Sequence, residues 1–233
     1  KFFLIFIFFL TLLISCTSKK SKNLSKDFYR NSSNNNFNNQ SINLNNLKIN
    51  LLKADNKLTP RLMQNNDGSY YYRYFKKPGE QKISLDEIKK RVLLGTEFYK
   101  KDRDKVMNLL IRINELKINN KLEHIKSGAL GLWIPSKETI IIDYRVIEMG
   151  SPTFLDVLNH EVIHVAQSCF GGSRKKFPKR IGLPLEYSTD LNLNLSHNLY
   201  SKNSEEVLKL EREAFTYSKV DGMAIKLLNN FCE

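Results

Sequence analysis

Two histidines and a glutamate lie within five consecutive residues of this chain. His160, Glu161 and His164 stand in the order H-E-x-x-H. Positions four apart on an α-helix share one face, so both imidazoles can reach a single metal ion at Zn–N distances of about 2.0–2.1 Å. Glu161 directly follows the first histidine, which suits a general base acting on metal-bound water. The alternative is a buried helix whose histidines are only hydrogen-bonded.

The flanking residues predict the helix that must carry this motif. Ser151 is a candidate N-cap, Pro152 fits the first helical position, and Gly171 and Gly172 are typical of a helix C-terminus. On the side opposite the histidines, apolar residues recur at steps of three and four: Leu155, Leu158, Val162, Val165 and Cys169. A helix with one apolar side and one metal-binding side belongs in a core beside a cleft.

The first residues are typical of an exported chain. Lys1 precedes a largely apolar run that is too short to span a membrane and has the size of a signal-peptide core. The run ends in Leu-Ile-Ser-Cys, and Cys16 resembles the lipidated cysteine of bacterial lipoproteins. That resemblance implies a membrane-anchored lipoprotein of the cell envelope. Ordinary secretion and an uncleaved anchor are the alternatives.

The next stretch is polar and rich in asparagine and serine, so it cannot offset the entropy of becoming ordered. We therefore predict a signal peptide over 1–15, a lipid-anchored flexible tether over 16–55 and a catalytic domain over 56–233. The net charge of +13 is spread along the chain without a recognised nucleic-acid motif, so no nucleic-acid partner is expected. The densest basic cluster, residues 174–180, is either a solvated loop or a contact with anionic headgroups.

Strand and helix patterns alternate before the motif helix. An Asn-Asp-Gly turn at residues 66–68 precedes an aromatic strand, and the S-x-x-E pattern at Ser84 is a helix capping box. A second helix is predicted over 104–117. Residues 128–146 favour a β-hairpin, because β-branched side chains flank a Pro-Ser break. The chain is therefore expected to be α+β.

A hairpin followed by an H-E-x-x-H helix resembles the zincin metallopeptidases, whose active-site helix follows a sheet with a substrate-binding edge strand. The resemblance implies a small sheet that ends in an edge-strand hairpin and is packed by helices, among them the H-E-x-x-H helix and a C-terminal ligand helix. Ile140, Ile141 and Ile142 are the candidates for an edge that hydrogen-bonds an extended peptide. An ordinary core strand is the equal alternative.

A catalytic zinc ion normally has three protein ligands and an open water position. Metzincins continue the motif with glycine and histidine where this chain has Gln167 and Phe170, which excludes that class. Gluzincins take a glutamate from a later helix, often followed by alanine. Glu213 resembles that pattern and is preferred to Glu211 and Glu206 as the third ligand.

Glu213 falls in one long helix predicted over 204–230. A surface carboxylate, or a salt bridge to Lys209, is the alternative for it. The thermolysin-like pattern also has a later aspartate that supports the first histidine, and Asp221 or Asp190 could serve. A second donor to the oxyanion is also implied, and the sequence leaves four candidates: His197, Tyr187, Tyr200 and Tyr217.

Cys169 and Cys232 could form a disulfide in an exported protein, or could be free and buried. Taken together, the residues predict zinc-dependent peptide-bond hydrolysis in the cell envelope, with Zn²⁺ as cofactor, Glu161 as general base and a peptide or protein substrate. The first alternative is an envelope lipoprotein that binds zinc or peptide without turnover. The second is a module that binds polyanions or membrane surfaces.

Overall fold

The computed structural model of the chain describes residues 41–75, 83–196, 200 and 203–232. The predicted signal peptide, the lipidation site Cys16 and most of the predicted tether lie outside these residues. The described residues belong to one compact unit. Among the described helices, none is both long enough and apolar enough to cross a bilayer.

Helix α3 (Leu44–Leu58) shows that the tether predicted over 16–55 extends too far along the chain. Asn43 caps the helix, and Leu47 and Leu51 are buried in the core. The apolar residues recur every three or four positions, but asparagines surround them and lower the mean hydropathy of the segment. The folded region therefore includes the whole of α3.

Asp55 joins α3 to the motif helix α7 (Gly150–Phe170). Its carboxylate accepts hydrogen bonds from the backbone N–H and the hydroxyl of Ser151, at 2.8 and 2.6 Å, and from the Arg103 guanidinium at 2.6 Å. All three residues are buried. Ser151 was expected to cap α7 with its own side chain. Instead, the helix already begins at Gly150, and the carboxylate of Asp55, on the distant helix α3, accepts the hydrogen bond from the Ser151 backbone N–H.

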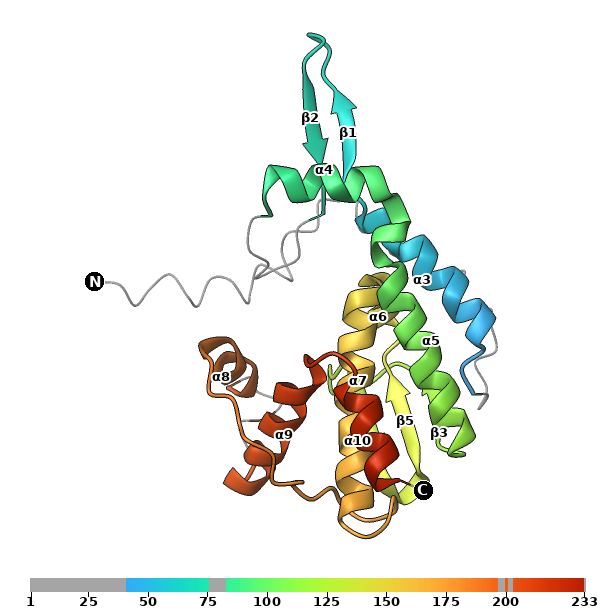
Figure 1. The fold of residues 1–233 in the computed structure, drawn as a ribbon, viewed down its shortest axis with the longest axis vertical. Coiled ribbons are helices and arrows are strands. Elements are labelled where there is room, and N and C mark those ends of the chain that lie inside the picture. The colour runs from blue at the N-terminus through green and yellow to red at the C-terminus, as the bar shows by residue number, and fades with distance from the viewer. Residues whose placement is uncertain (1–40, 76–82, 197–199, 201–202, 233) are drawn as a thin grey trace, which may run out of the picture. The chain divides into compact units, whose positions relative to one another are not determined.

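Strands β1 (Arg61–Gln64) and β2 (Tyr70–Arg73) form an antiparallel hairpin that extends beyond α4 in Figure 1. Gly68 adopts a φ of 85° in the connecting turn, where the left-handed conformation favours glycine. The Asp67 side chain accepts a hydrogen bond from the Ser69 backbone N–H. The predicted turn and aromatic strand are confirmed.

Helix α4 (Leu85–Leu94) begins at the predicted capping box. The Ser84 hydroxyl accepts a hydrogen bond from the Glu87 backbone N–H at 3.2 Å. A 3₁₀ segment (Gly95–Tyr99) leads into α5 (Lys100–Glu115), whose apolar side is buried in the core. In Figure 1, α3 and α5 lie side by side along the sheet.

The sheet next to α7 has the order β3-β5-β4, with β3 at Asn119–Leu122, β4 at Gly131–Ile134 and β5 at Thr139–Ile142. Strands β4 and β5 are antiparallel and joined by the 3₁₀ turn Pro135–Lys137, so the predicted hairpin is confirmed. Strand β5 also pairs in parallel with β3. Ile140–Ile142 therefore form the central strand, and the expectation that they form the edge is wrong. The edge strand beside α7 is β4.

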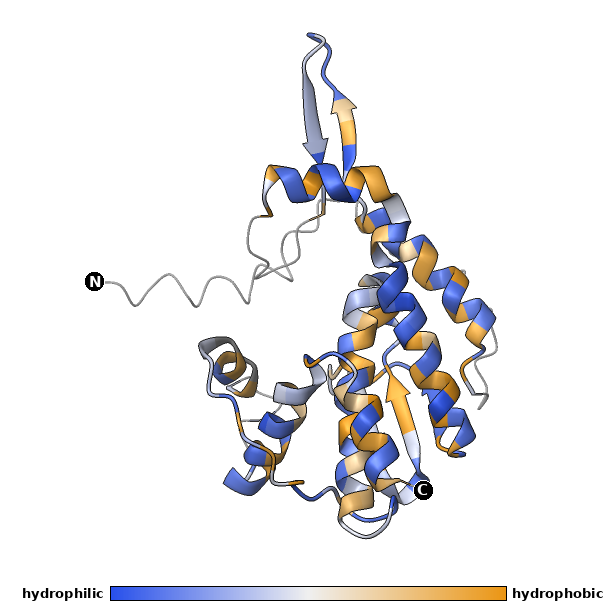
Figure 2. Cartoon of the chain, in the orientation of Figure 1, coloured by the Kyte–Doolittle hydropathy of each residue, from blue (hydrophilic) through white to orange (hydrophobic). Residues whose placement is uncertain are grey.

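Helix α7 follows the short helix α6 (Arg145–Glu148) and is the central element of the core. Most of its residues are buried, because α3, α5, α9, α10 and the sheet all contact it. Figure 2 shows apolar residues along α7 and β5 where these elements meet. A helix enclosed in this way can hold polar side chains in fixed positions.

The C-terminal region consists of α8 (Thr189–Leu195), α9 (Glu205–Ser218) and α10 (Met223–Phe231). The single helix predicted over 204–230 is divided at Gly222, whose φ of 71° lies outside the range of right-handed helix. Both α9 and α10 pack on α7. Helices beside small sheets confirm the α+β class.

Candidate metal centre

Helix α7 places His160 and His164 one turn apart on the same face. Their Nε2 atoms are 3.1 Å apart, and both side chains are almost fully buried. The two rings are nearly perpendicular, with centroids 4.7 Å apart. Two ring nitrogens at this separation are close enough to bind a single metal ion once both rings are neutral.

Glu211 on α9 supplies a third atom at that point. Its Oε2 lies 3.2 Å from the Nε2 of His160 and 3.4 Å from the Nε2 of His164. Ligands about 2.0–2.1 Å from a tetrahedral zinc ion lie roughly 3.3 Å from one another. The three observed distances match that spacing, so the residues fit a zinc ion. Among the residues that the structure describes, they form a group of potential ligands.

The charges within this group favour an ionised glutamate beside His164. Burial alone would lower the pKa of His164, but the carboxylates of Glu211 and Glu161 and the hydrogen bond with Gln167 together raise that pKa to about 9. Burial alone would raise the pKa of Glu211, and the two histidines instead hold it well below its usual range. Burial lowers the pKa of His160, an effect that Glu211 only partly offsets. The carboxylate of Glu211 and a neutral His160 ring are forms that bind a metal ion, and the charged His164 ring would release a proton on binding one.

Glu161 lies beside the group and against the edge strand. A Cβ atom added to Gly131 on β4 would lie 2.5 Å from its Oε1, so only glycine leaves room for this carboxylate. Burial raises the pKa of Glu161 to about 7, while the positive charge of His164 and a hydrogen bond from the Trp133 backbone N–H act in the opposite direction. The sequence placed Glu161 next to the metal ligands, and the structure adds its contact with β4.

Glu213, the third ligand preferred from the sequence, is not part of this group. Its carboxylate is fully buried on another side of α9, where it accepts hydrogen bonds from the backbone N–H groups of Ile181, Gly182 and Leu183, each at 2.9 Å. The alanine that follows Glu213 is also buried. The pattern was correct in predicting a buried carboxylate with close helix packing, and wrong about which partners it meets. Glu211 takes the place next to the histidines.

Gln167 connects Glu213 to the histidines. Its Oε1 is 2.7 Å from the Nδ1 of His164, and its Nε2 is 2.9 Å from Glu213. From the sequence alone, the only conclusion drawn from Gln167 is that the chain lacks the metzincin pattern. Its position three residues after His164, on the same helix face, was the signal that could have revealed this contact.

The aspartates considered as supports for the first histidine do not fill that role where the structure describes them. Asp221 is exposed and pairs with Lys101 and Lys105. The side chain of Asp190 lies outside the described part of the chain. Within that part, the Nδ1 of His160 is buried without a hydrogen-bond partner.

The candidates for the oxyanion donor separate clearly. His197 is outside the described residues. Tyr187 is exposed and lies under the guanidinium of Arg212, and the Tyr217 hydroxyl donates to the backbone of Pro184. Tyr200 is the candidate near the site. Burial and then the carboxylates of Glu211 and Glu161 raise its pKa well above the usual value, which keeps its hydroxyl protonated as a donor.

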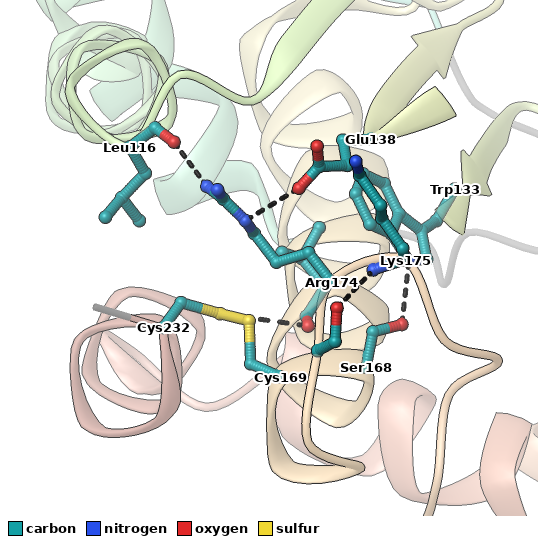
Figure 3. Close-up of a disulfide and its surroundings, with 10 residues drawn as sticks. Leu116, Trp133, Glu138, Ser168, Cys169, Arg174, Lys175 and Cys232 are labelled. Carbon is teal, nitrogen blue, oxygen red and sulfur yellow. Dashed lines mark hydrogen bonds and ion pairs between the residues drawn. A yellow bond between two sulfur atoms is a disulfide. The ribbon is translucent and has the colours of Figure 1, made fainter. Parts of the chain in front are cut away.

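A disulfide closes the far end of α7. Cys169 and Cys232 are bonded, with Cα atoms 5.4 Å apart, so the end of α10 is tied to the end of the motif helix (Figure 3). Beside it, Arg174 donates to the carbonyl of Leu116 and pairs with Glu138 at 2.9 Å. This arginine of the basic cluster is therefore engaged within the fold, which weakens the reading of the cluster as a surface for anions.

No family model, curated protein or solved structure matches this chain. The conclusions about its chemistry therefore rest on the residues that the fold brings together. The mixed helix and sheet structure is compatible with the predicted class, and His160, His164 and Glu211 form a group that could hold a metal ion.

Proposed function

We propose that the chain is a zinc-dependent peptide hydrolase in which His160, His164 and Glu211 hold the ion. The observation that supports this most strongly is the convergence of two Nε2 atoms and one carboxylate oxygen at mutual distances of 3.1 to 3.4 Å. A bound zinc ion would act as a Lewis acid and lower the pKa of a coordinated water from 15.7 to about 7. Three protein ligands leave one position of a tetrahedral site for that water.

Glu161 is the general base in this proposal. It follows His160 directly and is held against β4 by the Gly131 gap and the Trp133 backbone N–H. Its carboxylate would take the proton from water and later deliver it to the leaving amine. Tyr200 is the proposed donor to the oxygen of the scissile carbonyl, because its hydroxyl lies within the electrostatic influence of both site carboxylates.

Strand β4 is the proposed docking edge for the substrate. The carbonyl of Leu130 accepts from Asp143 at the end of β5, so the alternate residues Gly131 and Trp133 direct their backbone groups away from β5. An extended peptide that adds to this edge would hydrogen-bond to Gly131, beside Glu161. The pairing supports a peptide as substrate and gives no preference for its side chains.

The test measures zinc content and hydrolysis in parallel. Purified protein should hold one zinc ion per chain and cleave members of a mixed peptide library, and chelation should abolish cleavage. Glu161→Gln should keep the zinc ion and reduce cleavage by a factor on the order of 100 to 10,000, the range for a lost general base. Wild-type protein that holds no zinc would contradict the proposal.

The burial of the histidines and Glu161 favours one alternative, in which zinc has a structural role without turnover. In that case Glu161→Gln and wild type would both hold zinc and would leave the same peptide library intact. Membrane anchoring through Cys16 remains a separate proposal from the sequence. Incorporation of labelled fatty acid into wild type, and its loss in Cys16→Ser, would test it.

A further inference from the structure

Both carboxylate oxygens of Glu213 accept hydrogen bonds from the backbone. The N–H groups of Ile181, Gly182 and Leu183 point at its two oxygens, and its side chain is fully buried. A carboxylate that accepts several backbone hydrogen bonds cannot rotate without losing them. The segment 181–183 therefore fixes the orientation of this side chain.

That orientation dictates how the Gln167 amide must point. One end of the amide lies 2.9 Å from a Glu213 oxygen and 3.3 Å from the carbonyl oxygen of Leu210. Both neighbours only accept hydrogen bonds, so this end must be the NH₂ group, and a flipped amide would face two acceptors with its own oxygen. The amide oxygen is thereby left toward the Nδ1 of His164, 2.7 Å away.

The amide oxygen in turn selects where His164 carries its proton. Because that oxygen can only accept, Nδ1 must carry a proton whether the ring is neutral or positively charged. The other ring nitrogen, Nε2, is then the one directed toward His160 and Glu211. His160 has no comparable support, since its buried Nδ1 lacks a hydrogen-bond partner among the described residues.

We propose that Gln167 and Glu213 form a positioning pair that holds His164 as the pre-oriented ligand of the site. Neither residue touches the ion. Glu213 orients Gln167, and Gln167 holds the ring and the proton of His164. The proposal rests on the zinc site proposed above, but the state of the His164 ring can also be measured without metal. Loss of an outer-shell partner of a metal ligand typically weakens metal binding by about 10- to 100-fold.

The first experiment compares two neighbouring variants in competition with a chelator. Gln167→Met keeps the length of the side chain and removes its amide, and zinc should bind about 10- to 100-fold more weakly. Ser168→Ala is the matched control. It lies next to Gln167 on α7 and removes a buried hydrogen bond that the Trp133 side chain donates, and this bond does not involve the histidines. Its zinc affinity should equal that of wild type. Equal affinities in Gln167→Met and wild type would overturn the proposal.

The second experiment observes the His164 ring by NMR in metal-free protein. Wild type and Ser168→Ala should show a resolved Nδ1 proton that exchanges slowly with water, and Gln167→Met should not. If Gln167→Met fails to fold, Glu213→Gln should show faster exchange of the same proton. Slow exchange in both Gln167→Met and Glu213→Gln would refute the positioning role. A wild-type protein without zinc affinity would instead refute the proposed function, and this ring measurement would still stand.

Discussion

Two carboxylates on α9, Glu211 and Glu213, are separated by one residue and meet opposite surroundings. At 3.6 residues per turn they project about 200° apart around the helix axis. Glu211 faces two imidazole nitrogens at 3.2 and 3.4 Å, whereas Glu213 faces backbone N–H donors at 2.9 Å. The comparison shows that burial of a glutamate does not define its role. The role of a buried glutamate is defined by the groups it contacts, and these groups belong to other elements of the fold.

The largest expected effect is on folding, and it separates the two glutamates. Glu213→Ala leaves the buried Gln167 amide and the partly buried N–H groups of residues 181–183 without this acceptor, and an unsatisfied buried donor costs about 1–3 kcal/mol. We expect the free energy of unfolding, measured with urea and without metal, to fall by about 4 kcal/mol or more. Glu211→Ala should cost clearly less, since the side chain of Glu211 is 17% exposed whereas that of Glu213 is fully buried. A larger loss for Glu211→Ala would reverse the comparison.

Zinc affinity should rank the two residues in the opposite order. Glu211→Gln removes a direct ligand, so binding should weaken by more than the roughly 100-fold upper range for outer-shell partners. Glu213→Gln should weaken binding less. Competition with a chelator measures both, and a stronger effect of Glu213→Gln would return Glu213 to the position of ligand.

A variant of strand β4 tests whether the edge strand belongs to the same site as the histidines. Gly131→Ala places a methyl group where the Glu161 carboxylate lies, at 2.5 Å from Oε1. A displaced catalytic group can cost about 100-fold in rate, so peptide cleavage should fall while zinc binding is retained. Leu132→Ala, which alters an exposed neighbour, is the control. Unchanged cleavage in Gly131→Ala would separate β4 from catalysis.

The smallest expected effect is on the pH dependence of stability, and it concerns another buried carboxylate, Asp143, which pairs with the guanidinium of Arg145. Burial alone would raise the pKa of Asp143, but hydrogen bonds from Arg145 and from the Ile125 backbone N–H lower it to about 2. A pKa lowered in the folded state stabilises the fold above the ordinary pKa near 3.8, and this contribution is lost as pH falls toward 2. Asp143→Asn should flatten the dependence of unfolding free energy on pH between about 4 and 2. A wild-type slope in that variant would contradict the assignment.

Local sequence patterns were sufficient for several elements of the structure. The capping box at Ser84, the Asn-Asp-Gly turn and the hairpin before α7 follow from short-range preferences of the backbone. Helix α3 was missed because its apolar residues are sparse among asparagines, and only contact with α7 shows that they form a core face. The sequence also did not show that β5 is the central strand of its sheet, because its second partner, β3, is distant along the chain.

By itself, the sequence determined the pairing of His160 with His164 and the place of Glu161 beside them, because the helical repeat alone brings the two histidines together. Tertiary structure decided that Glu211 is the carboxylate beside the two histidines, because the rotation of α9 against α7 depends on packing along the whole helix pair. It also decided the role of Glu213, whose N–H donors come from residues 181–183. A helix repeat acts over four residues, whereas the docking of α9 joins residues about 50 positions apart.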